Sequence, residues 1–302
     1  MQRLLAAAIC LLLFAPWSSL AGHGGVSAIL SSDIPPYRQA FDGFKSAVQG
    51  ENGGGRIVEH NLRIEGDGAM ERIAAEHPLL VFAVGPEASK FARERMKNVP
   101  VVFAMVLNAE SLAGANVTGV SLEISMRAKL ERIRKILPDA RRIGVVYSPA
   151  SAPLYREVAQ QCRGMGLQAV GREIPTGKEL HEAFDAMKEQ IDLFLMIPDT
   201  KIYFPKSIEH LLMDGLKHRV PVVGLASSYT RAGAIVSFEA DYADLGRQAG
   251  EMALRIAGGE KPSRIEPARP KRVKMSINLV VAERLGIRVP PEILREASDV
   301  YR

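Results

Sequence analysis

The chain has 302 residues, of which 47% are hydrophobic and 24% charged, so it suits two domains better than one large core. Its formal net charge of +5 at pH 7 is small for this length and argues against a strongly basic nucleic-acid-binding protein. One of its two cysteines, Cys10, lies in the N-terminal leader, so the mature chain would keep Cys162 and form no internal disulfide.

Residues 1–21 have the pattern of a signal peptide. Arg3 provides a positive start, residues 4–14 form a short apolar core, and Ser19 and Ala21 are small residues at the expected cleavage site. A retained membrane helix is the alternative, but the apolar run is short for an anchor. Because Ile9 precedes Cys10, lipidation is not expected. We therefore expect a soluble, monomeric protein in the periplasm.

Short apolar runs predict strands in the first half of the chain, and apolar residues at helical spacing predict the helices between them. Phe41, Phe44 and Val48, for example, share one face of a helix that begins near Tyr37. The predicted strands are residues 26–30, 56–59, 79–84, 99–103 and 117–121, with a further helix near residues 67–77 and another after residue 87.

The second half repeats the alternation of strand and helix. Ser125 is expected to cap a helix that Pro138 ends. The predicted strands are residues 142–147, 167–170, 193–197, 220–224, 235–238 and 275–278, separated by helices that include residues 176–188 and about 242–257. Residues 227–231 are expected to form a loop.

The two halves follow one plan. Strand 79–84 and strand 193–197 are each followed by a helix pattern and then by a nearly identical Val-Pro-Val-Val strand. This alternation predicts an α/β fold with two Rossmann-like lobes, each a parallel sheet covered by helices. The expected lobes are residues 22–120 with part of 238–275, and residues 121–237 with part of 276–302.

Polar residues follow the carboxyl ends of the predicted strands, where ligands bind in doubly wound sheets. Asp199 would bind a ligand ammonium group, with turn chemistry as the alternative. The helix beginning near Ser89 would suit a ligand carboxylate, with helix capping as the alternative. Tyrosines in these loops would stack on a flat ligand or simply pack. The candidate ligand-binding residues are Asp33, Tyr37, Glu87, Ala88, Ser89, Asn108, Ser148, Ser151, Asp199, Thr200, Tyr203 and Ser227.

The sequence contains no short signature of catalysis. A Gly-x-Ser-x-Gly elbow, a Walker loop and a Gly-x-Gly-x-x-Gly turn after a strand are all missing. The six histidines do not have the spacing of metal ligands. We therefore expect neither catalysis, nor a cofactor, nor a metal. The basic cluster between Arg264 and Lys274 is broken by Pro267 and Pro270 and lacks aromatic residues, so we interpret it as a solvated crossover and not a nucleic-acid site.

Four segments carry a resemblance to a known family: residues 114–121, 136–147, 244–253 and 277–291. Together they resemble ABC-transporter substrate-binding proteins of the ABC_sub_bind, or TrpX-like, type. The resemblance implies a type I periplasmic binding protein fold, with three crossovers between the lobes and a hinged cleft. It also implies amino-acid ligands, aromatic ones included, and an inner-membrane permease and ATPase as partners. The loop at residues 198–200 is similar to a family loop that contacts ligand.

These observations predict the solute-binding component of an ABC importer, which captures a small molecule between its lobes by hinge closure. The alternative is a periplasmic ligand-sensing module that signals to a membrane receptor or sensor kinase without transport. A hydrolase on a similar scaffold is a weaker third possibility. Replacing Asp199 by Ala is expected to weaken ligand binding with little loss of thermal stability.

Overall fold

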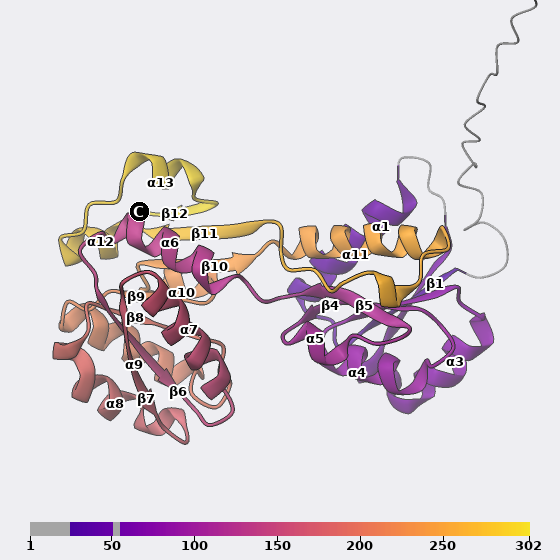
Figure 1. The fold of residues 1–302 in the computed structure, drawn as a ribbon, viewed down its shortest axis with the longest axis horizontal. Coiled ribbons are helices and arrows are strands. Elements are labelled where there is room, and N and C mark those ends of the chain that lie inside the picture. Colours follow the sequence, from indigo (N-terminus) through magenta and orange to yellow (C-terminus); the bar gives the residue numbers. More distant parts are fainter. Residues whose placement is uncertain (1–24, 51–54) are drawn as a thin grey trace, which may run out of the picture. The chain divides into compact units, whose positions relative to one another are not determined.

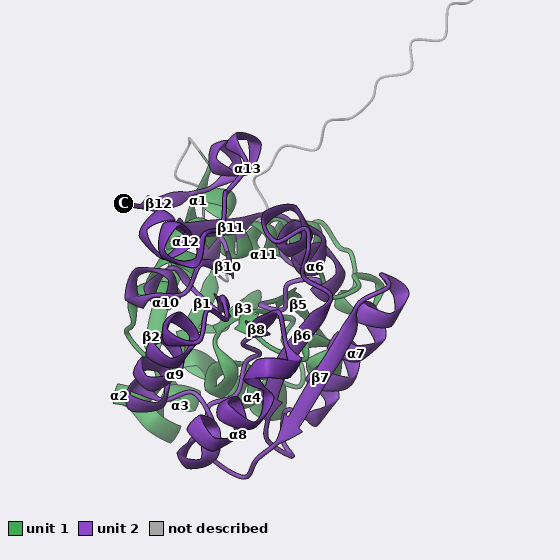
Figure 2. Ribbon diagram, turned by 90° about the vertical axis from the view of Figure 1, so that its left-hand side faces the viewer, with its two compact units in different colours: residues 1–121, 245–268 green, residues 122–244, 269–302 purple. Residues whose placement is uncertain are grey.

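The computed structural model of the protein describes residues 25–50 and 55–302. These residues form two compact units, each built around one sheet (Figures 1 and 2). Unit 1 is drawn from residues 1–121 and 245–268, and unit 2 from residues 122–244 and 269–302. The chain passes between the units after Ser121, Asp244 and Ala268. The expected signal peptide, residues 1–21, lies outside the described residues.

Unit 1 contains a five-stranded sheet, in the order β2-β1-β3-β4-β5, in which all neighbours are parallel. Parallel strands buried on both faces are expected to be apolar throughout, and every residue of β1, β3 and β4 is buried. The strands are β1 (Val26–Leu30), β2 (Ile57–Asn61), β3 (Leu80–Val84), β4 (Val101–Val106) and β5 (Val117–Ser121).

Helices cover both faces of this sheet (Figure 1). On one face Phe44 stacks on Phe82, with ring centroids 3.9 Å apart. Gly246 lets a second helix approach the first closely there, because a Cβ at Gly246 would lie 1.7 Å from the Ala40 carbonyl oxygen. The helices are α1 (Pro35–Gln49) and α11 (Tyr242–Ala257) on this face, and α3 (Ala69–Glu76) and α4 (Pro86–Arg95) on the other, with the short α2 (Leu62–Glu65) and α5 (Ala109–Leu112).

Unit 2 contains a seven-stranded sheet in the order β12-β11-β10-β9-β8-β6-β7. All neighbours are parallel except β10 and β11, which pair antiparallel. The strands are β6 (Arg142–Tyr147), β7 (Gln168–Glu173), β8 (Leu193–Leu195), β9 (Val222–Gly224), β10 (Val236–Ala240), β11 (Val273–Asn278) and β12 (Asp299–Tyr301).

Two apolar clusters pack on opposite faces of this sheet. One contains α6 (Met126–Ile136), α7 (Ala152–Gly164), α12 (Leu279–Leu285) and α13 (Pro291–Glu296); the other contains α8 (Leu180–Met187) and α9 (Pro205–Lys217). Cys162 lies in the first cluster, where burial raises the pKa of its thiol to about 11, so the thiol is an unreactive packing group.

The structure corrects some predicted elements. The strand predicted at residues 193–197 is shorter in the structure, where β8 ends at Leu195. Beyond this end, the amide of the buried Met196 still donates to the Val223 carbonyl. The predicted loop at residues 227–231 is instead a short helix, α10 (Ser227–Ala232). In the basic cluster, Arg269 lies 3.7 Å from Glu123 and Arg272 lies 3.8 Å from Asp244, and both arginine side chains are exposed, as expected for a solvated segment. No helix in the described part of the chain is long and apolar enough to span a membrane.

Candidate functional site

In unit 2, three of the predicted residues come together where β6 and β8 end. The Asp199 carboxylate accepts hydrogen bonds from the Ser148 amide at 2.9 Å and from the Ser151 hydroxyl. It also accepts one from the Lys201 amide at 2.9 Å, which is the turn chemistry that the sequence left open for Asp199. Because β6 and β8 are neighbours in a parallel sheet, these residues meet although about fifty positions separate them.

These bonds keep Asp199 charged. Burial alone would raise the pKa of Asp199, but hydrogen bonds from Ser151, Ser148 and Lys201 lower it, and the net effect is a pKa below the usual value. A carboxylate offers about four acceptor positions. The three bonds therefore hold a half-buried anion in a fixed orientation.

The other predicted residues of unit 2 have separate positions. Tyr203 is buried, and its hydroxyl donates to the Val146 carbonyl at 3.3 Å, so the packing alternative describes it. Burial raises the pKa of Tyr203. Thr200 is exposed in the turn after Asp199, and Ser227 begins α10 after β9. Their contact with ligand stays a prediction.

In unit 1, Ser31 joins the carboxyl ends of β1 and β3, and the sequence did not single out this residue. The buried Ser31, directly after β1, donates its hydroxyl to the Val84 carbonyl at 2.9 Å. The same oxygen accepts the Ala88 amide of α4 at 2.9 Å. Gly85, which follows Val84 and precedes α4, has φ +90°, and a Cβ at this position would lie 2.6 Å from the Ser31 hydroxyl. Only glycine fits this position without displacing its neighbours.

Tyr37 and Glu87 lie at this same turn. Burial raises the pKa of Tyr37, and the nearby Glu87 carboxylate raises it further. A Cβ on Gly85 would lie 2.7 Å from the Tyr37 ring, so the ring packs against the turn. Ser89 and Ala88 are buried at the start of α4, and the Ser89 hydroxyl donates back to the Gly85 carbonyl at 2.7 Å.

Two predicted residues of unit 1 are not part of this cluster. Asp33 pairs with Arg38 at 2.5 Å, and Arg38 also reaches Glu59 at 2.7 Å. The hydrogen bond from Arg38 lowers the pKa of Asp33. Asn108 is exposed, with φ +55°, immediately before α5. The pairing of Arg38 with two carboxylates had no sequence signal, because Arg38 lies on α1 and Glu59 lies on β2, about twenty positions away.

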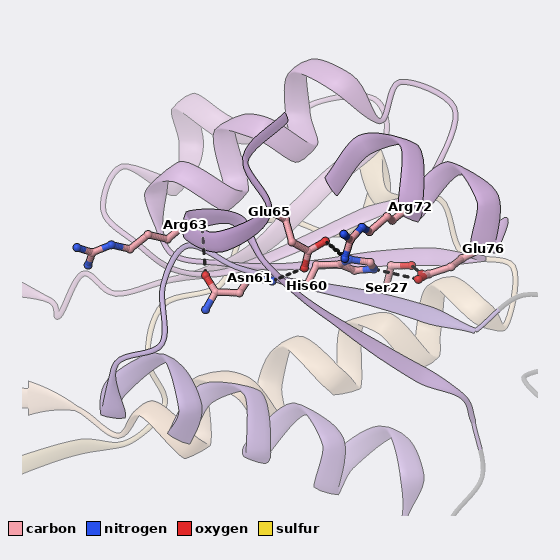
Figure 3. A network of polar contacts seen from close by, with 7 residues as sticks. All are labelled: Ser27, His60, Asn61, Arg63, Glu65, Arg72 and Glu76. Carbon is pink, nitrogen blue, oxygen red and sulfur yellow. Dashed lines mark hydrogen bonds and ion pairs between the residues drawn. The ribbon is translucent and has the colours of Figure 1, made fainter. Parts of the chain in front are cut away.

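A second polar network in unit 1 has a structural role (Figure 3). The ring nitrogens of the buried His60 lie 3.1 Å from Glu65 on one side and 3.1 Å from Glu76 on the other. The Ser27 hydroxyl also donates to Glu76, at 2.5 Å. The network therefore links β1 and β2 to α2 and α3. Among the described residues, no cluster of His, Cys, Asp and Glu is suited to hold a metal ion.

The fold, together with the polar groups at the carboxyl ends of the strands, defines the class of protein. Two α/β units, three chain passages and polar groups at the carboxyl ends of parallel strands form a type I periplasmic binding protein fold. An ABC domain from Streptococcus pneumonia in complex with L-Trp has the same fold, with a TM-score of 0.68 and 22% identity over 92% of this chain and 99% of that one. A ligand-free, open substrate-binding protein with adhesive properties from Clostridium difficile gives a TM-score of 0.78, with 21% identity over 91% of this chain and 98% of that one.

The chain belongs to the ABC transporter substrate binding protein family, whose model matches residues 66–301. A tyrosine-binding protein of Clostridioides difficile (strain R20291) is 23% identical over 192 residues, which cover 60% of this chain. The match spans 55% of that relative's length. The resemblance found in the sequence is thus confirmed at the level of family and fold.

Proposed function

We propose that the protein is the extracytoplasmic solute-binding component of an ABC importer. In this proposal a small molecule binds between the two units, hinge closure buries it, and an inner-membrane permease and ATPase take it up. Family membership supports the transport role, and the expected signal peptide supports a periplasmic location. Relatives whose names state tyrosine binding or a complex with L-Trp make amino acids the first solutes to test.

The observation that carries the proposal is the preorganised Asp199 carboxylate. It is ionised, half-buried and held by three donors from two loops. Such a group suits an ammonium group, because charge-assisted hydrogen bonds are stronger than neutral ones. Its place after a parallel strand is where ligands bind in open α/β sheets.

A thermal-shift screen of the purified protein tests this function. A ligand at 100 times its Kd stabilises the folded state by about 2.7 kcal/mol, so a true solute raises the melting temperature in proportion to the logarithm of its concentration. Amino acids, amines, nucleosides and sugars form the screen. A hit is then followed by uptake assays in cells with and without the gene. Binding without any loss of uptake in the deletion strain would contradict the importer role.

A further inference from the structure

Unit 1 has an apolar pocket at the amino ends of its strands, the edge of the sheet opposite to the strand-end loops. Its volume is about 320 Å³, at the lower end of the range for small-molecule sites. The residues at which β1, β3 and β4 begin line it, together with the last turns of α1 and α11. The lining belongs entirely to unit 1 and includes Val26, Leu79, Leu80, Pro100, Leu254 and Ala257.

Part of this apolar lining faces solvent. Leu79 is 42% exposed and Ala257 is also exposed, whereas Val26 and Leu80 are buried. Covering an open apolar surface with another apolar group removes both from water and is favourable. The pocket therefore suits an apolar occupant, and the chain itself supplies one close by.

The leader joins the fold at the rim of this pocket. The Leu79 amide donates to the Gly25 carbonyl at 3.0 Å, and the Val26 amide donates to the Arg56 carbonyl at 2.8 Å. A Cβ on Gly25 would lie 2.2 Å from the Arg56 carbonyl oxygen, so the backbone is held closely at this point. Residues 1–24 are therefore attached directly beside two residues of the pocket lining.

Residues 11–20 of the leader carry apolar side chains that suit such a pocket. They are Leu11, Leu12, Leu13, Phe14, Trp17 and Leu20. The segment 21–24, which joins them to Gly25, is short and contains Gly22 and Gly24, which permit a reversal of the chain. A short linker gives an effective concentration on the order of millimolar, so even a weak apolar contact is populated.

We propose that residues 11–20 fold back in the precursor and occupy this pocket. Its lining includes Leu254 and Ala257 of α11, which are synthesised after the segment of unit 2 that ends at Asp244. The leader therefore stays accessible while the chain is incomplete, and it is covered once unit 1 is complete. Removal of residues 1–21 opens the pocket in the mature protein. The inference rests on the expected signal peptide and does not depend on the identity of the solute.

Trp17 reports on the occupied pocket, because it is the only tryptophan of the chain. The uncleaved 302-residue precursor, purified after expression in the cytoplasm, is expected to show blue-shifted Trp17 emission and reduced quenching by iodide relative to the same precursor in denaturant. Emission and quenching equal to those of the denatured precursor would overturn the inference. Protection that depends on protein concentration would also overturn it, because the leader would then contact a second copy.

Substitutions in the lining locate the contact. Leu79→Asp introduces a charge into the pocket and is expected to restore iodide quenching of Trp17 to the level of the denatured precursor. Leu107→Asp is the matched control and should keep the protection, because Leu107 is a leucine of unit 1 with 40% exposure that follows β4 at the opposite edge of the sheet.

Ala257→Asp repeats the test on α11, so the inference remains testable if Leu79→Asp does not fold. Circular dichroism establishes which variants fold. Protection of Trp17 that survives in the folded pocket variants, or that is lost equally in Leu107→Asp, would show that the leader does not occupy this pocket.

Discussion

Asp199 joins two loops through its hydrogen bonds and is also a candidate ligand-binding residue. It accepts the amide of Ser148, a residue with 0% exposure, and the amide of Lys201. Removing the shared acceptor leaves the buried Ser148 amide with only its longer bond to the Ser151 hydroxyl, at 3.1 Å, and takes the side-chain acceptor from the Lys201 amide. The structure therefore revises the sequence-based expectation that Asp199→Ala would leave stability nearly unchanged.

We predict that Asp199→Ala lowers the free energy of unfolding by about 1–3 kcal/mol, measured by chemical denaturation. Asp199→Asn should lose less, because its amide oxygen can still accept, while its ligand affinity falls with the lost charge. Equal stability of the Ala variant and the unaltered protein would show that the three hydrogen bonds contribute little.

Lys129, in contrast, is a buried ammonium group whose desolvation outweighs its attraction to nearby carboxylates. It lies on α6 with 6% exposure, and burial lowers its pKa to about 8, although Glu157 and Glu123 act in the other direction. The folded pKa is below the unfolded value of 10.5, so the protonated form disfavours folding at pH 7. This cost, about 3 kcal/mol, is relieved as pH rises from 8 towards 10.5.

Replacing Lys129 by Met should therefore stabilise the protein at pH 7, by about 1–3 kcal/mol. The advantage should shrink between pH 8 and 10.5, as the unaltered protein gains stability. Denaturant titrations at several pH values measure this, with the exposed Lys135→Met on the same helix as control. A destabilised Met variant at pH 7 would mean that the lysine's interactions with Glu123 and Glu157 exceed its desolvation cost.

Helix contacts depend on glycines that the sequence pattern alone did not distinguish. Gly246 of α11 meets the Ala40 carbonyl of α1, whereas Gly164 at the end of α7 has open space around the position of a Cβ. Gly246→Ala should reduce unfolding free energy by about 1–3 kcal/mol through overpacking. Gly164→Ala should be neutral or stabilising, by up to about 1 kcal/mol. Comparing the two melting curves tests the contact, and equal effects would contradict it.

The sequence predicted most elements of the fold because buried strands are apolar runs and surface helices have a clear period. It also placed Ser148, Ser151 and Asp199 in strand-end loops. The role of Ser31 was not predictable, because its partners Val84 and Ala88 lie more than fifty positions away and depend on the pairing of β1 with β3. The short helix α10 was missed because six polar and small residues give no periodic signal.

At the scale of the whole molecule, two hydrogen bonds and one ion pair join neighbouring chain passages within the units. In unit 1 the Ser121 amide donates to the Ala268 carbonyl at 2.8 Å. In unit 2 Arg269 lies 3.7 Å from Glu123, and the Asp241 amide donates to the Arg272 carbonyl at 3.1 Å. These bonds favour motion of each unit as a rigid body in the proposed closure.

If closure occurs, saturating ligand should reduce the radius of gyration measured by small-angle X-ray scattering. The change should follow the binding isotherm, because a ligand shifts the population only through its preference for one form. A bound protein whose scattering curve equals that of the free protein would contradict closure as the mechanism of capture.

The interrupted course of unit 1 along the chain has a consequence for biogenesis. Residues 245–268, which supply most of α11, are made only after the 123 residues of unit 2 from Leu122 to Asp244. Until they emerge, the face of α1 around Ala40 and Phe44 lacks its covering helix. Completion of the first unit therefore depends on a segment that is synthesised after the long segment of the second unit, so one face of its sheet stays partly uncovered until residues 245–268 have been made.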